Sequence, residues 1–208
     1  MVVRHAPLVA VASTTLALLA GCGEDAEPRR AVGPDELTSH DGVPCPERLP
    51  TGEDPGGHGF GTDEPAATAP SLPAPDRAWV CRYTATDAGP GPGGDGVTFR
   101  WERDAQPAPV DAAQLAALSE PLGALRPAEQ SMMCTSDLGP RWLLALDRGG
   151  DLTGVVVDDY GCRAVRLTDD PFATAPGDRG AGGDGTVAGV LSAPPELLAG
   201  IKAAAARD

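Results

Sequence analysis

The sequence predicts an α+β fold, namely an antiparallel sheet of about five to six strands with two helices and two disulfides. Short stretches in which apolar and polar residues alternate predict the strands, and the Gly- and Pro-rich links between them predict turns. Leucines spaced three and four residues apart predict a helix after the second strand. Four cysteines beyond the N-terminal segment predict the disulfides.

Six segments carry the strand pattern. In residues 97–102, large apolar side chains alternate with polar ones without exception, which is typical of a strand with one buried and one exposed face. The same alternation places Trp79 and Trp101 on buried faces. Gly149-Gly150 suits a tight hairpin turn between the third and fourth strands. The predicted strands are 79–84, 97–102, 142–147, 152–158, 162–168 and 186–191.

Capping residues mark the two predicted helices. Asp111 can cap the first helix, with Gln114 three residues later as in a capping box. Pro121 is expected to end or kink this helix near Glu120, because proline lacks the N–H group that a helix interior needs. Ser192 is the expected cap of a second helix that runs to about residue 206.

The N-terminal segment has the order of a signal peptide. Residues 1–4 carry one permanent positive charge, and an uncharged, mostly apolar run covers residues 6–20. As a helix this run would span about 22 Å, which is short of a hydrocarbon core of about 30 Å, so a transmembrane helix is not expected.

The apolar run ends in Leu19-Ala20-Gly21-Cys22, which resembles the lipobox of bacterial lipoprotein precursors. The resemblance implies that residues 1–21 are removed and that the Cys22 thiol carries a diacylglyceryl group, joined in many members by an N-acyl chain. Two or more acyl chains hold a protein stably in a membrane. The implied location is the extracytoplasmic face of the cell membrane, with the lipid bilayer as partner through acylated Cys22. An ordinary secretory signal is the alternative.

The acidic composition argues against nucleic acid as a partner. The chain has 16 Lys and Arg against 30 Asp and Glu, a formal charge of −14. Residues 1–21 contain one arginine and no acid, so the rest of the chain is near −15. Basic patches that neutralise phosphates are therefore not expected. One lysine, one isoleucine and no asparagine, with abundant alanine, glycine, proline and arginine, make the composition similar to that of high-GC bacteria such as actinobacteria.

Once Cys22 is assigned to lipid, Cys45, Cys81, Cys134 and Cys162 remain. An even number of cysteines in an oxidising compartment predicts two disulfides. None of the four forms a CxxC pair, so neither a zinc site nor thioredoxin-like chemistry is expected. Four cysteines allow three pairings, and the sequence alone does not choose among them.

A recurring order of features favours one pairing. The stretch "VCRYTATD" leads through a Gly/Pro-rich loop to "GGDGVTFRW" and a capped helix, while "GCRAVRLTDD" leads through another loop to "GGDGTVAGVL" and the second helix. Two related halves would each hold one disulfide, Cys45–Cys81 and Cys134–Cys162. Chance is the alternative, because GGDG recurs easily in a chain with 27 glycines.

Composition divides the chain into three parts. These are a lipoprotein signal peptide at 1–21, a flexible tether at 22–44 and a disulfide-stapled α+β domain at 45–208, with possible repeat halves 45–126 and 134–206. Within the domain, residues 52–75 are expected to form a long loop, which counts against a compact architecture.

The sequence contains no pattern for catalysis, for a metal site or for a cofactor. His40 and His58 lie in expected loops, and the GxSxG, HExxH and P-loop motifs are absent. Four acids near the predicted hairpin could gather calcium, although acids at strand ends are more often solvated turn residues, which is the interpretation we prefer. They are Asp147, Asp151, Asp158 and Asp159.

The sequence therefore predicts a membrane-anchored surface lipoprotein whose domain is a non-catalytic interaction or binding module. An envelope protein or a glycan is the candidate partner. Two other functions stay open. A cell-envelope enzyme that uses carboxylates needs two acids facing each other across a groove, and a carrier of a small ligand needs an apolar pocket.

Overall fold

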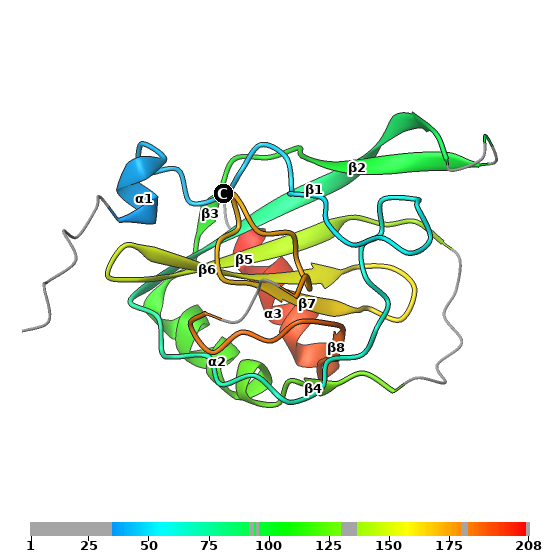
Figure 1. Ribbon diagram of the computed structural model, residues 1–208. Helices are drawn as coiled ribbons and strands as arrows, with labels where there is room; N and C mark the ends of the chain where they lie inside the picture. Colours follow the sequence, from blue (N-terminus) through cyan, green and yellow to red (C-terminus); the bar gives the residue numbers. More distant parts are fainter. Residues whose placement is uncertain (1–34, 92–93, 95, 130–136, 180–182, 207–208) are drawn as a thin grey trace, which may run out of the picture. The chain divides into compact units, whose positions relative to one another are not determined.

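An antiparallel sheet of eight strands forms the centre of the computed structural model, which describes residues 35–91, 94, 96–129, 137–179 and 183–206 (Figure 1). The strand order is β2-β1-β5-β6-β7-β8-β4, and β3 pairs with β1. The strands are β1 Arg77–Pro90, β2 Val97–Arg103, β3 Ala108–Pro109, β4 Arg126–Pro127, β5 Arg141–Arg148, β6 Asp151–Asp158, β7 Val165–Thr168 and β8 Leu191–Ser192. The helices are α1 Glu36–Ser39, α2 Ala112–Gly123 and α3 Pro195–Ala205.

The predicted class, α+β with an antiparallel sheet, is confirmed, but the predicted numbers of strands and helices are wrong. The structure has eight strands rather than five to six, because β3 and β4 contain two residues each and are too short to show alternation. It has a third helix, α1, inside the segment 22–44 that was expected to be a tether. Asp35 caps α1 by accepting a hydrogen bond from the Thr38 N–H at 2.7 Å, and Leu37 is buried.

Both faces of the sheet are covered. Helices α2 and α3 pack on one face, against alternate side chains of β5 such as Leu144 and Leu146. On the other face, Leu143 and Val156 pack with Tyr83 and with residues of the loop that precedes β1. The predicted long loop at 52–75 therefore forms a cover over the sheet, and β5 and β6 are buried along almost their whole length.

Two details of the helices and one of the core differ from expectation. Helix α2 continues through Pro121 to Gly123, three residues beyond the expected end near Glu120, and Pro121 itself is buried. Ser192 belongs to β8, and Pro194 occupies the N-cap position of α3. Trp79 is half exposed near the start of β1, with the Arg77 guanidinium 5.3 Å from its ring, so its predicted place in the core is wrong.

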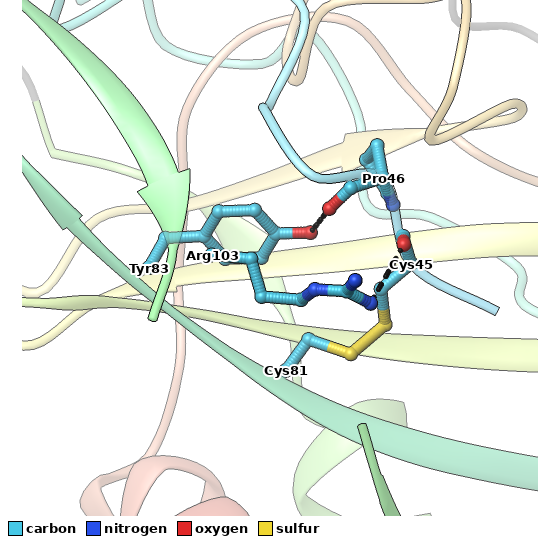
Figure 2. Close-up of a disulfide and its surroundings, with 5 residues drawn as sticks. All are labelled: Cys45, Pro46, Cys81, Tyr83 and Arg103. Atoms are coloured by element: carbon cyan, nitrogen blue, oxygen red, sulfur yellow. Dashed lines mark hydrogen bonds between the residues drawn. A yellow bond between two sulfur atoms is a disulfide. The ribbon is translucent and has the colours of Figure 1, made fainter. Parts of the chain in front are cut away.

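The predicted disulfide between Cys45 and Cys81 is present, and it joins the loop before β1 to β1 itself (Figure 2). Both cysteines are fully buried. Two further bonds fix the same segment, since the Tyr83 hydroxyl donates to the Pro46 carbonyl at 2.8 Å and Arg103 Nη1 donates to the Cys45 carbonyl at 3.1 Å. In the chain-entropy view, closing a loop of this length stabilises the fold by roughly 3–4 kcal/mol.

The prediction of two disulfides is only partly met, because the described residues contain one complete disulfide. Cys162 is disulfide-bonded, while its predicted partner Cys134 lies outside the described residues. The two expected halves share the order strand, GGDG, strand and helix. Their strands differ strongly in length, however, because β1 and β2 have 14 and 7 residues while β7 and β8 have 4 and 2.

Helix α1 carries a carboxyl group with an unusual pKa. Glu36 Oε2 accepts a hydrogen bond from the Leu152 N–H of β6 at 2.7 Å. Burial raises the pKa of Glu36 to about 7, against a lowering by the Leu152 bond, and repulsion from Asp170, Asp151 and Asp184 adds to the increase. The folded protein therefore favours the protonated form of Glu36. The stability that this proton contributes is fully present below about pH 4.5 and is lost as the pH rises through about 7.

We predict that Glu36→Gln removes this pH dependence. As the pH rises from about 4.5 to about 8, the free energy of unfolding of the wild type should fall relative to that of Glu36→Gln by roughly 1–2 kcal/mol. This value is smaller than the full pKa shift would give, because the half-buried carboxyl group is partly screened by solvent. Urea unfolding at several pH values measures the difference. Glu64→Gln is the control, since Glu64 is exposed and pairs with the exposed Arg179. A constant gap between wild type and Glu36→Gln would contradict the assignment.

Candidate functional site

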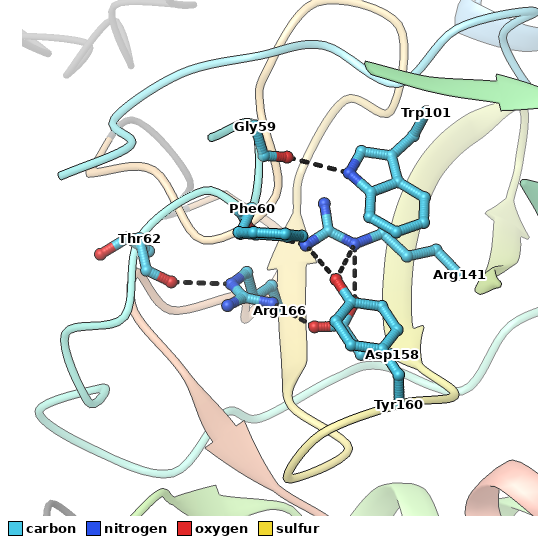
Figure 3. Close-up of polar contacts among 8 residues, drawn as sticks. All are labelled: Gly59, Phe60, Thr62, Trp101, Arg141, Asp158, Tyr160 and Arg166. Carbon is cyan, nitrogen blue, oxygen red and sulfur yellow. Dashed lines mark hydrogen bonds and ion pairs between the residues drawn. The ribbon is translucent and has the colours of Figure 1, made fainter. Parts of the chain in front are cut away.

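Three charged side chains lie together on the loop-covered face of the sheet (Figure 3). Arg141 begins β5 and is paired in register with Asp158, which ends β6. Arg166 of β7 is paired with Val156, two residues before Asp158. Because side chains two residues apart lie on the same face of a strand, this register brings Arg141, Asp158 and Arg166 to one place. We call them the arginine–aspartate cluster.

The cluster is a buried ion network in which two arginines share one carboxylate. Arg141 Nε lies 2.6 Å from Asp158 Oδ1, and Arg166 Nη1 lies 2.8 Å from Asp158 Oδ2. The three side chains are only 5–7% exposed. Two cations face one anion, so these three groups carry a net positive charge inside a protein whose total charge is strongly negative. Burial of this kind requires that the remaining donors find acceptors.

The loop before β1 supplies acceptors for both arginines. Arg141 Nη2 donates to the Phe60 carbonyl at 2.6 Å, and Arg166 Nε donates to the Thr62 carbonyl at 2.9 Å. Trp101 Nε1 donates to the carbonyl of Gly59 at 2.9 Å. Gly59 has a φ of +83°, and a Cβ atom there would overlap the Phe99 carbonyl, so a glycine is required where the loop approaches β2. Residues 59–62 are thus fixed to the sheet through their backbone.

Aromatic rings enclose the Arg141 guanidinium. Its central carbon lies 4.2 Å from the centre of the Trp101 ring, and Tyr160 stacks on Trp101 with ring centres 5.6 Å apart and planes 5° from parallel. The Tyr160 hydroxyl accepts a hydrogen bond from Arg141 Nη2 at 2.9 Å. Burial, followed by repulsion from Asp158, raises the pKa of Tyr160, so its hydroxyl stays protonated. The site is a fixed cationic group surrounded by rings.

Arg141 also lines a small cleft of about 220 Å³ between the covering loop, β2 and the segment before Arg179. Phe60, Phe99 and Trp101 supply aromatic rings to this cleft, and its acids are on the covering loop and at residue 178. The lining residues are Pro50, Thr51, Gly52, Glu53, Asp54, Gly59, Phe60, Gly61, Thr98, Phe99, Trp101, Arg141, Ala175, Pro176 and Asp178.

The interpretation of the hairpin acids as solvated turn residues is wrong for two of the four. Asp158 is 3% exposed within the cluster, and Asp147 is 1% exposed, bonded to Arg77 Nε at 2.6 Å and to the Gly150 N–H at 2.7 Å. Asp159 accepts from Lys202 Nζ at 2.8 Å. In sequence these acids look alike, because nothing local shows which strand end a loop will cover. Among the described residues, no group of His, Cys, Asp and Glu could hold a metal ion.

The structure brings together two of the predicted site residues. Cys22 and Cys134 lie outside the described residues, and Cys45 and Cys81 form the disulfide described above. The sequence analysis considered Asp158 only as one of four hairpin acids, and it missed Arg141 and Arg166. An available signal was the position of Arg141 and Asp158 at facing ends of one predicted hairpin.

Comparison of this chain with known protein families, proteins and structures identifies no relative. No protein-family model, no curated protein and no solved structure matches this chain. Within the described part of the chain, none of the helices has the length and apolar character needed to cross a membrane. The function must therefore be argued from the site itself.

We predict that Asp158→Asn destabilises the protein by about 3–5 kcal/mol, because two buried guanidinium groups lose the carboxylate that balances them. Chemical denaturation measures the loss. Glu102→Gln is a matched control, because Glu102 also contacts two arginines, Arg48 and Arg100, each at 3.2 Å, but at the surface. It should cost less than about 1 kcal/mol. Similar losses in the two variants would show that the cluster is not a buried network.

Proposed function

We propose that this protein is a lipid-anchored surface lipoprotein whose domain is a non-catalytic binding module, and that the cleft beside Arg141 is its binding site. The observation that carries the binding role is a buried, fixed guanidinium in the wall of a cleft that also offers aromatic rings. Binding sites commonly combine apolar walls with a few fixed polar groups. Asp158 is occupied by two arginines, so it acts as their counter-charge rather than as a base.

The anchor rests on the N-terminal sequence. The positive start, the apolar run at 6–20 and Leu19-Ala20-Gly21-Cys22 follow one another in the order of a lipoprotein precursor. Acylation of Cys22 would hold the domain at the extracytoplasmic face of the cell membrane. The charge of the chain supports attachment by lipid rather than by electrostatic attraction to anionic headgroups.

We predict that Cys22→Ala moves the protein from the membrane fraction to the soluble fraction or the medium, because the thiol that receives the lipid is lost. Fractionation of cells that produce the full-length chain, followed by immunoblotting, measures the distribution. Cys162→Ala is the control, since it removes a cysteine without touching the lipobox and should leave the protein with the membrane. Firm membrane attachment of Cys22→Ala would contradict the anchor and would leave the cleft unaffected.

We also propose that Cys134 pairs with Cys162. The support is that Cys162 is disulfide-bonded while Cys45 and Cys81 are bonded to each other. Digestion of the full-length protein without reduction, followed by mass spectrometry, should give a linked peptide that contains Cys134 and Cys162. A peptide in which Cys22 is linked to Cys162 would contradict both this pairing and the acylation of Cys22.

A further inference from the structure

We propose that the cleft beside Arg141 binds an acidic monosaccharide, that is, a pyranose ring that carries one carboxylate, as in a hexuronic acid. The inference rests on the proposed binding function and names its ligand class. Four observations support it: an unused donor on a buried arginine, two half-buried aromatic rings, carboxylates at the rim, and the size of the cleft.

The unused donor belongs to Arg141. Its Nε and Nη2 atoms bond to Asp158, Phe60 and Tyr160, whereas its Nη1 atom has no hydrogen-bond partner among the described residues (Figure 3). The side chain is 94% buried, since only 6% of it is exposed, and the unpartnered Nη1 atom is not among the described polar atoms that are both fully enclosed and without a hydrogen bond. Arg141 lines the cleft and Nη1 is its one guanidinium nitrogen without a bond to a described residue, so we assign this N–H pair to a ligand oxygen there. A guanidinium and a carboxylate form one of the strong charge-assisted hydrogen-bonded pairs found in proteins.

The charge of the arginine–aspartate cluster favours an anion at Arg141, whereas the three acids of the cleft, Glu53, Asp54 and Asp178, favour hydroxyl groups in the rest of it. Asp158 balances one of its two arginines, and the remaining positive charge is shared by Arg141 and Arg166. A ligand carboxylate on Arg141 Nη1 would complete the neutralisation without moving any protein group. The bonds from Arg141 to Phe60 and Tyr160 hold the guanidinium in place, so binding would cost little side-chain entropy.

The aromatic rings suit the apolar face of a sugar. Phe60 and Phe99 are half buried, with ring centres 5.9 Å apart and planes inclined by 38°. Both line the cleft. The C–H groups of a pyranose can pack on such rings, and this part of the ligand would contribute burial of apolar surface.

Carboxylates at the rim explain why the ligand should carry hydroxyl groups as well. Asp178 Oδ1 accepts a hydrogen bond from the Glu53 N–H at 2.9 Å, and Asp54 Oδ2 accepts from the Gly59 N–H. Each carboxylate can accept several bonds, so the second oxygen of each remains available as an acceptor. Acceptors of this kind repel a carboxylate and bind sugar hydroxyls, so Arg141 is the one cationic residue in the described lining that can hold the ligand carboxylate. Arg141 and the rim carboxylates together favour a ligand that carries one carboxylate and several hydroxyl groups.

The size of the cleft limits the ligand. A volume of about 220 Å³ is smaller than the range of roughly 300–1,000 Å³ that is usual for drug-sized ligands. One sugar ring fits this space. A polysaccharide would therefore place a single acidic residue in the cleft, with its neighbours outside.

The test uses the full-length protein in non-ionic detergent, titrated with D-glucuronate, D-glucose and acetate by calorimetry or NMR. We expect D-glucuronate to bind at least about 10-fold more tightly than either D-glucose, which lacks the carboxylate, or acetate, which lacks the ring. Methyl β-D-glucuronide distinguishes the source of the ligand, because its blocked anomeric oxygen resembles that of a residue within a glycan. Binding of this glycoside indicates a glycan, and its exclusion indicates a free sugar acid.

Two variants test the assigned contacts. Arg141→Lys should weaken D-glucuronate binding by about 10-fold or more, because the planar donor pair is lost. Arg82→Lys is the matched control, since Arg82 also lies near a tryptophan ring, that of Trp142 at 5.8 Å, and near an acid, Asp104 at 3.6 Å, but does not line the cleft. If Arg141→Lys does not fold, Phe99→Leu replaces it, and this variant should weaken D-glucuronate binding while Arg82→Lys leaves it unchanged.

Several results would overturn the inference. These are no binding of D-glucuronate at tens of millimolar, equal affinity for D-glucose or acetate, and unchanged affinity in Arg141→Lys or, where that variant does not fold, in Phe99→Leu. None of them bears on the lipid anchor, which is tested separately by Cys22→Ala. Conversely, loss of the anchor would leave the binding result intact, so the two failures are distinguishable.

Discussion

The structure depends on one buried carboxylate that two arginines share. Without Asp158, Arg141 and Arg166 would be two unbalanced cations between the sheet and the loop that covers it. With it, their remaining donors reach the Phe60 and Thr62 carbonyls, and a long loop that lacks regular secondary structure becomes a fixed layer over the sheet. The disulfide at Cys45 and Cys81 attaches the start of that loop, and the cluster attaches its middle.

Local patterns predicted much of the fold. Alternation located β2, the Gly149-Gly150 turn located the β5–β6 hairpin, and the Asp111–Gln114 capping box located α2, because these signals arise from neighbours in sequence. What could not be predicted depends on long-range packing. No local feature shows that residues 59–62 would cover the sheet, or that Glu36 would bond to Leu152, 116 residues away.

The same limitation explains why the site was missed. A charged residue at the end of a strand looks the same whether it faces water, as Asp151 does, or lies beneath a loop, as Asp158 does. Tertiary contacts decide between the two. The outcome is a locally positive group within a chain of formal charge −14. That contrast connects the architecture with the proposed binding of an anion, because the charge that stabilises the covering loop is also the charge that faces the cleft.

The most direct test of this account is native-state hydrogen exchange at three side-chain groups of the wild-type protein, the Nε–H groups of Arg141 and Arg166 and the indole N–H of Trp101. These protons bond to Asp158 and to the covering loop. If the cluster fixes the loop, all three should be strongly protected and should exchange through one common opening, with equal free energies and equal dependence on denaturant. Rapid exchange of the arginine protons beside a protected sheet would contradict the account.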